Sequence, residues 1–145
     1  MYALLSLLLV FTSCAGESGK TSVDDFPSSI VRIMPLGASR VEGARPAFES
    51  YRYELWKLLV ADGIAFDFVG TRQDEASYPR YAGLRFDTDH EGRSGITSAG
   101  IRAGIDMWLR EVSTPDIVLF SSPGGNDALT LMPYEDTIAN INAII

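Results

Sequence analysis

Residues 30–39 read IVRIMPLGAS, a run of β-branched and aliphatic residues that ends in a glycine and a serine. Such a run favours a β-strand, and Gly37 permits a tight turn where the strand ends. We therefore predict a strand that delivers Ser39 at its carboxyl end. Taken alone, a serine after a glycine is most often a turn or a helix cap, so its meaning depends on the rest of the chain.

Helical and extended patterns alternate beyond this strand. Apolar residues recur at helical spacing over residues 48–59, and Asp62-Gly63 ends the predicted helix. Residues 65–70 predict a second short strand. Residues 71–95 show no period, and a loop of that length in a compact domain is usually functional or disordered.

The second half of the chain repeats the alternation. Apolar positions over residues 101–112 predict another amphipathic helix, and residues 117–120 predict a strand that is apolar on both faces, as at the centre of a parallel sheet. Pro133 begins a third predicted helix. This order calls for an α/β fold, a three-layer α/β/α sandwich with a parallel sheet. A flavodoxin-like binding or redox domain shares the order, but the loop after residues 30–36 lacks the donors that cradle a phosphate.

The composition excludes several kinds of partner. The 145 residues carry a formal net charge of −7 with scattered basic residues, which argues against nucleic acid because phosphate binding needs clustered Lys and Arg. Cys14 is the only cysteine and His90 the only histidine. The sequence therefore predicts no intrachain disulfide and no Cys/His metal site.

The first residues predict an export signal. Residues 3–11 are apolar except for Ser6, too few for a membrane span of about 20 residues but of the length of a signal-peptide core. Small residues then lead to Cys14, in a pattern that resembles a bacterial lipobox. We expect a signal peptide over residues 1–14 with lipidation at Cys14, a flexible tether over 15–29, and the domain over 30–145. An ordinary secretory signal and a buried first strand with a core cysteine are the alternatives.

This export signal predicts a protein outside the cytoplasm, either a lipoprotein of the bacterial cell envelope or a secreted protein. A lipid on Cys14 would be its only contact with a membrane.

Three loops follow the three predicted strands, and in open parallel sheets the site lies beyond the carboxyl ends of the strands. The loops contain residues 35–40 (PLGASR), 89–97 (DHEGRSGIT) and 121–127 (SSPGGND). Their glycines let backbone N–H groups approach a ligand, and the Asn126 amide is a further donor. Donors arranged in this way stabilise the oxyanion of acyl transfer, each by roughly 3–4 kcal/mol. Singly these loops are ordinary turns, but together they predict one site.

The three loops resemble the sequence blocks of the SGNH (GDSL-like) serine hydrolases. That family has Gly-Asp-Ser after its first strand, a Gly block after its second and Gly-x-Asn-Asp after its third. This chain has, in the same order, Gly37-Ala38-Ser39, Ser94-Gly95-Ile96-Thr97 and Gly124-Gly125-Asn126-Asp127. The resemblance covers residues 30–145, with Ala38 in place of the family's usual Asp. The Gly-x-Ser-x-Gly motif of the α/β-hydrolases does not occur.

The resemblance implies roles for three residues. Ser39 would be the nucleophile, and its backbone N–H would join those of Gly95 and the Asn126 side chain as the donors of an oxyanion hole. Neither a metal nor an organic cofactor is implied. The activity implied is hydrolysis of a carboxylic ester through an acyl-serine intermediate.

The family's fourth block, Asp-x-x-His, supplies the base and is absent from this chain. The sequence ends in an apolar helical pattern at residues 141–145, so we expect a C-terminally incomplete domain that is inactive by itself. His90, with two aspartates nearby, is a weaker candidate for the base. A structural role or a place in the substrate cleft is favoured for His90, and Arg40 and Asp127 are also expected to line that cleft.

The resemblance to the SGNH hydrolases and the export signal together predict the removal of acetyl or other short acyl groups from polysaccharides. The partner expected is thus a small-molecule or carbohydrate ester. The alternative is a non-catalytic carbohydrate-binding domain that keeps the sheet and cleft but lacks the base.

Overall fold

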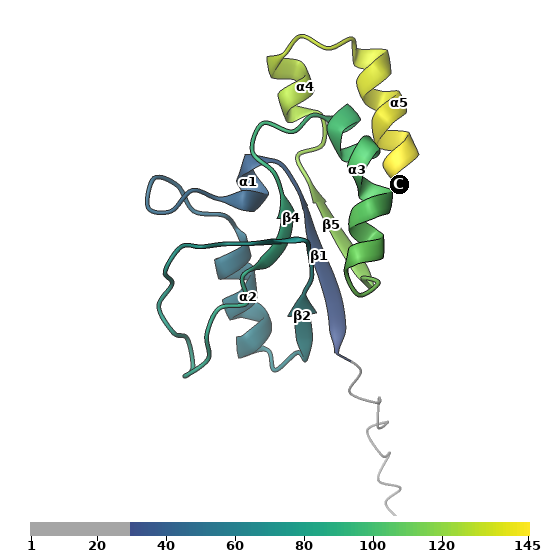
Figure 1. The fold of residues 1–145 in the computed structure, drawn as a ribbon. Coiled ribbons are helices and arrows are strands. Elements are labelled where there is room, and N and C mark those ends of the chain that lie inside the picture. Colours follow the sequence, from purple (N-terminus) through teal and green to yellow (C-terminus); the bar gives the residue numbers. More distant parts are fainter. Residues whose placement is uncertain (1–29) are drawn as a thin grey trace, which may run out of the picture.

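The computed structural model describes residues 30–145 (Figure 1). The predicted signal peptide, the tether and Cys14 lie outside the described residues. No helix in the described part of the chain is long and apolar enough to cross a membrane.

Strand β1 (Val31–Gly37) is the centre of the sheet. It pairs in parallel with β2 (Phe66–Phe68), β4 (Asp89–Gly92) and β5 (Ile117–Ser121). Strands β2 and β4 pair with successive parts of one edge of β1, and β5 pairs along the other edge (Figure 1). The short β3 (Arg72–Gln73) is antiparallel to β4.

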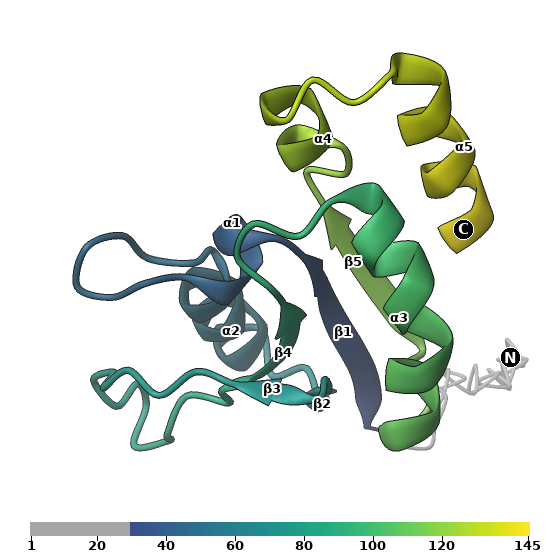
Figure 2. The same ribbon diagram turned by 45° about the horizontal axis from the view of Figure 1, so that its top comes forward.

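Helices cover both faces of this sheet. On one face lies α2 (Arg52–Ala61), and on the other lies α3 (Ser98–Glu111), which α5 (Tyr134–Ile144) flanks (Figure 2). Two short helices, α1 (Ser39–Glu42) and α4 (Gly125–Leu129), follow β1 and β5. The predicted three-layer α/β/α class is confirmed, with one antiparallel strand added to the parallel sheet.

Alternation along β1 divides the core in two, because successive side chains of a strand point to opposite faces. Ile33 packs with Phe68 and the aromatic residues of α2. Met34 and Leu36 instead belong to a buried cluster with Ile101, Ile105 and Trp108 of α3. Burial of these apolar side chains, each contributing about 1.5–3 kcal/mol, fixes β1 between the two helical layers.

One prediction about the strands was wrong. Residues 71–95 are not wholly irregular, since they contain β3 and β4. The apolar strand β5 pairs with β1 along one edge, and this is its only partner within residues 30–145.

The carboxyl ends of β1, β4 and β5 lie at the same end of the sheet. Figure 2 shows α1, the turn before α3, and α4 gathered there. The three sequence blocks are therefore brought together in the fold.

Candidate active site

Ser39 is the first residue of α1, two positions after the end of β1. Gly37 has a φ of +154°, and a Cβ there would lie 2.7 Å from the Ser121 carbonyl oxygen and 2.8 Å from Val41 Cγ2. Only glycine fits this junction without displacing β5 or α1. Ser39 is half-buried, and neither its N–H nor its hydroxyl has a hydrogen-bond partner within residues 30–145. Both groups are therefore available to a ligand.

The second block forms a β-turn over residues 93–96. The Ile96 N–H donates to the Arg93 carbonyl oxygen at 3.1 Å, and Gly95 takes the left-handed position with a φ of +77°. A positive φ at the third residue is typical of a type II turn and favours glycine. The Arg93 N–H donates to the Gly37 carbonyl oxygen at 3.0 Å, which ties this turn to the end of β1. The Gly95 N–H makes no hydrogen bond within the described residues.

The third block is attached to the second. Asn126 Nδ2 donates to the Ile96 carbonyl oxygen at 2.7 Å, which uses one of its two N–H donors. The same bond orients the amide and leaves the second N–H for a ligand. Ser39, the Gly95 turn and Asn126 thus form one connected arrangement at the end of the sheet.

Asp127 is not a cleft residue, contrary to the prediction. It is 1% exposed, and its two carboxylate oxygens accept hydrogen bonds from the Ser98 N–H at 2.8 Å and from the Ser98 hydroxyl. Asp127 therefore fastens the start of α4 to the start of α3. A buried carboxylate requires such partners, since desolvation without them is costly.

Two hollows meet at Ser39. The smaller, of about 310 Å³, is lined by Ser39 and Asn126 together with Ser121, Ser122 and Leu129. The larger, of about 600 Å³, has these residues among its lining: Ser39, Arg40, Phe48, Glu49, Tyr51 and Glu54. Arg40 is exposed and lines both hollows.

A hydrogen bond joins the two hollows. The Ser121 hydroxyl donates to the Tyr51 hydroxyl at 3.2 Å. Burial raises the pKa of Tyr51, so its hydroxyl stays protonated at neutral pH and can donate in turn. An aromatic hydroxyl and an exposed aromatic ring, that of Phe48, therefore face the larger hollow.

His90 lies elsewhere. It is 1% exposed on β4, and its Nδ1 accepts a hydrogen bond from the Gly92 N–H at 2.9 Å. It lines a separate hollow of about 470 Å³ with Glu42, Arg72 and Asp74, and Ser39 is not among the lining residues. Burial, together with the Arg52 charge, lowers the pKa of His90 to about 4, so its ring is neutral at neutral pH. The structure therefore corrects its placement in the cleft of Ser39.

Arg52 is a structural residue that the sequence did not reveal. Its guanidinium is fully buried and donates to the carbonyl oxygens of Val41 at 2.7 Å, Glu42 at 3.0 Å and Thr88 at 3.2 Å. It also forms an ion pair with Asp74 at 2.8 Å. These bonds hold the end of α1 against the long loop. An Arg among the apolar-spaced positions of an amphipathic helix is the only signal that the sequence offered.

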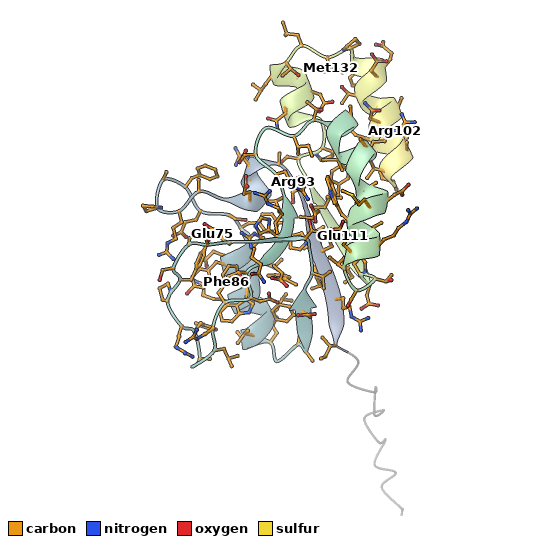
Figure 3. The ribbon with its side chains drawn as sticks, in the orientation of Figure 1. Glu75, Phe86, Arg93, Arg102, Glu111 and Met132 are labelled. Carbon is orange, nitrogen blue, oxygen red and sulfur yellow. The ribbon has the colours of Figure 1, made fainter. Side chains whose placement is uncertain are left out.

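Glu91 anchors the start of the Gly95 turn. Its fully buried carboxylate accepts hydrogen bonds from the Thr71 N–H at 2.8 Å, the Thr71 hydroxyl at 2.7 Å and Arg93 Nε at 2.9 Å. Arg93, labelled in Figure 3, lies with Cζ 4.3 Å from the centre of the Trp108 ring. The ion pair and the ring contact fix the backbone from which the turn begins.

Comparison with solved structures identifies the fold. A carbohydrate esterase of family 3 from Clostridium thermocellum is 36% identical over 80% of this chain and 57% of its own, with a TM-score of 0.62. A serine-to-alanine mutant of an acetyl esterase, solved with acetate ion, is 30% identical over 79% of this chain and 54% of its own, with a TM-score of 0.66. AlinE4, an esterase of the SGNH-hydrolase family, is 22% identical over 80% and 51%, with a TM-score of 0.58.

The chain has the SGNH hydrolase fold. It spans just over half the length of the solved structures that it matches. No family model matches the chain, and no curated protein does. The SGNH resemblance of the three loops is therefore supported by the solved structures, through the fold that holds those loops.

Proposed function

We propose that the SGNH-fold chain contributes the nucleophile and the oxyanion hole of a serine esterase. The observation that carries this proposal is the hydrogen-bonded connection of the three blocks at one end of the sheet. Ser39 and Asn126 line one hollow, and Asn126 is bonded to the turn of Gly95. The unpaired N–H groups of Ser39 and Gly95 and the second Asn126 N–H are the donors that an oxyanion needs.

In the proposed reaction, Ser39 Oγ attacks the carbonyl carbon of an ester while a base takes its proton. The carbonyl oxygen becomes the oxyanion, and the three donors stabilise it. Collapse of the intermediate expels the alcohol, which receives the proton from the base. Water then attacks the acyl-serine and releases a carboxylic acid, restoring Ser39.

The base is the missing part of this machinery. His90 is the only histidine of the chain, and it lines a different hollow from Ser39. We propose that an Asp-x-x-His pair outside these 145 residues supplies the base, as the SGNH pattern implies. Residues 1–145 alone should then show no ester turnover.

The proposed substrate is an acetyl or short-acyl ester of a carbohydrate. Two solved neighbours are named as an acetyl esterase and a carbohydrate esterase. In this chain the larger hollow beside Ser39 offers the exposed ring of Phe48, the Tyr51 hydroxyl and two carboxylates. Aromatic faces pack against the apolar faces of sugars, while hydroxyl and carboxylate groups bond to their hydroxyls. We therefore place the alcohol part of the substrate in this hollow.

A direct test measures hydrolysis of p-nitrophenyl acetate by the full-length protein, by its Ser39→Ala variant and by residues 1–145. Turnover by the full-length protein alone supports the proposal. A Ser39→Ala variant as active as the unaltered protein would contradict it.

The second candidate is a non-catalytic carbohydrate-binding domain, which the location of His90 in a different hollow from Ser39 favours. It predicts that the full-length protein binds acetylated oligosaccharides, in isothermal titration, without consuming them. Release of acetate from the same oligosaccharides, followed by NMR, would decide for the enzyme.

We also propose that the protein is exported and lipidated at Cys14, which supports a role on extracellular polysaccharides. Metabolic labelling with an alkynyl fatty acid tests this directly. Label should be incorporated into the full-length protein in a bacterial host and lost in Cys14→Ala, and a labelled Cys14→Ala variant would exclude this attachment site.

A further inference from the structure

Glu42 lies three residues after Ser39, at the end of α1, and its carboxylate reaches the turn that carries Gly95. Oε2 accepts a hydrogen bond from the backbone N–H of Ser94 at 2.6 Å, and Oε1 accepts one from Arg72 Nη2 at 3.1 Å. Ser94 directly precedes Gly95 in the chain. A single side chain therefore joins the helix of the proposed nucleophile to the turn of a proposed oxyanion donor.

The backbones of the two segments are already in close contact. A Cβ on Gly92 would lie 2.4 Å from the Glu42 nitrogen and 2.8 Å from the Val41 carbonyl carbon, so α1 rests directly on the end of β4. One backbone bond follows, from the Arg93 N–H to the Gly37 carbonyl oxygen. Beyond Arg93, Glu42 provides the hydrogen bond that connects the turn to α1.

The other end of the turn is held by Asn126, whose Nδ2 donates to the Ile96 carbonyl oxygen. The turn is thus fixed at Ser94 by Glu42 and at Ile96 by Asn126, with Gly95 between the two attachments. The three proposed donors are connected through this sequence of bonds. Loss of either attachment would let the Gly95 N–H move relative to Ser39.

The charge of Glu42 suits this role. Its burial alone would raise its pKa, but the hydrogen bonds from Ser94 and the charge of Arg72 outweigh burial, and the pKa of Glu42 is lowered. The carboxylate is therefore ionised at neutral pH. A hydrogen bond from a backbone N–H to a charged carboxylate is shorter and stronger than one to a neutral acceptor.

We propose that Glu42 is a positioning residue of the oxyanion hole, which sets the place of the Gly95 N–H relative to Ser39. This inference rests on the proposed function, because it needs Ser39 and Gly95 to act on the same substrate. It differs from a surface ion pair with Arg72. Such a pair contributes little to folding and has no effect on the reaction.

The test removes each partner of the Ser94–Glu42 bond in the full-length protein. Glu42→Ala removes the acceptor. Ser94→Pro removes the N–H donor together with the Ser94 hydroxyl, and proline is favoured at the second position of a type II turn, so the turn itself is kept. Glu111→Gln, at an exposed position on α3 (Figure 3), is the matched control.

Each of Glu42→Ala and Ser94→Pro should lower kcat for p-nitrophenyl acetate by about 10- to 100-fold, because displacement of a catalytic group by 1 Å has effects of this size. KM should change by less than about twofold, since the ground state does not use the oxyanion hole. The double variant should be no worse than either single variant, because both remove the same bond. Glu42→Gln keeps an acceptor oxygen and should recover a large part of kcat.

The outcomes separate this inference from the proposed function. No turnover by the unaltered full-length protein contradicts the proposed function. Turnover with unchanged kcat in Ser94→Pro and Glu42→Ala contradicts only the role of Glu42. A fall in kcat with additive losses in the double variant also contradicts it, since the two changes would then act separately. Thermal unfolding of each variant checks that it is folded. If Glu42→Ala does not fold, Ser94→Pro and Glu42→Gln still test the role of Glu42.

Discussion

The two halves of the proposed oxyanion hole are built differently. The half that holds Ser39 and Gly95 is cross-linked by buried polar groups, with Arg52 bonded to four acceptors and Glu91 accepting three hydrogen bonds. The half that holds Asn126 is attached to the Gly95 turn and to α3 by two side chains, Asn126 bonded to Ile96 and Asp127 bonded to Ser98. The first half is thus held by a network of buried polar groups, whereas the second depends on a few specific bonds.

The largest effect on folding is expected at Arg52. Replacing it by Leu removes the ion pair with Asp74 and three hydrogen bonds to carbonyl oxygens, of which that of Glu42 has no other donor within residues 30–145, and should lower the free energy of unfolding by about 3–5 kcal/mol. Urea unfolding of the full-length protein measures the change, with the exposed Arg110→Leu as control. Equal stabilities of the two variants would contradict the claim that buried polar groups hold this half together.

Asn126→Ala tests the less firmly held half. It removes one oxyanion donor and should lower kcat by about 10²- to 10³-fold while KM changes little. Asn142→Ala, exposed on α5, is the matched control. A fall in kcat below about threefold would show that Asn126 does not act on the oxyanion.

Asp127→Asn is expected to have a smaller effect that reaches Asn126 indirectly. The amide keeps one acceptor oxygen for Ser98 and loses the other, which should cost about 1–3 kcal/mol of stability. Because Asp127 fastens α4, kcat should fall as well, with KM nearly unchanged. Steady-state kinetics and thermal unfolding measure both effects, with exposed Asp106→Asn as control. If Asp127→Asn loses stability but keeps its full kcat, the attachment of α4 through Asp127 does not position Asn126.

The effect expected at His90 is absent at neutral pH and appears only as the pH falls. Its pKa is lowered from 6.5 to about 4 by burial and Arg52, with Asp74 and Glu42 opposing the shift and Arg72 adding to it. Above pH 6.5 the ring is neutral in both folded and unfolded chains and makes no pH-dependent contribution. As pH falls from 6.5 towards 4 the unfolded chain takes up a proton that the folded chain does not, so stability is lost, by up to about 3 kcal/mol.

Replacement by Asn, which keeps an acceptor for the Gly92 N–H, isolates this contribution from the carboxylates that titrate over the same range. The difference in unfolding free energy between the unaltered protein and His90→Asn should be flat above pH 6.5 and shrink below it. A difference that is the same at pH 7 and pH 4.5 would show that the pKa of His90 is the same in the folded and unfolded chains, and hence that folding does not lower it.

Much of the fold and part of the candidate site could be predicted from the sequence. Apolar periodicity predicts the strand that ends before Ser39 and the helices α2, α3 and α5. The meeting of the loops after β1 and β5 follows from the rule that parallel strands share a carboxyl edge, whereas the Gly95 turn follows β4 and not the strand predicted at residues 65–70. The pattern at residues 89–92, Asp-His-Glu-Gly, gave no signal for β4 because its buried side chains are polar. Only contacts with Thr71, Arg93 and Gly92 make their burial tolerable.

The residues that hold the site together were the least predictable. Arg52 bonds to Thr88, 36 positions away, and Glu42 bonds to Ser94, 52 positions away. Periodicity reports the environment of an element and not its distant partners.

The central claim is that Ser39 is a nucleophile served by the three donors. Fluorophosphonates react with activated serines, so the most direct measurement is mass spectrometry of the full-length protein after treatment with such a reagent. One adduct on the peptide that contains Ser39, absent from the Ser39→Ala variant and formed at least about tenfold more slowly in Asn126→Ala, is the predicted result. A folded full-length protein that hydrolyses esters but carries its adduct on another serine would contradict the account.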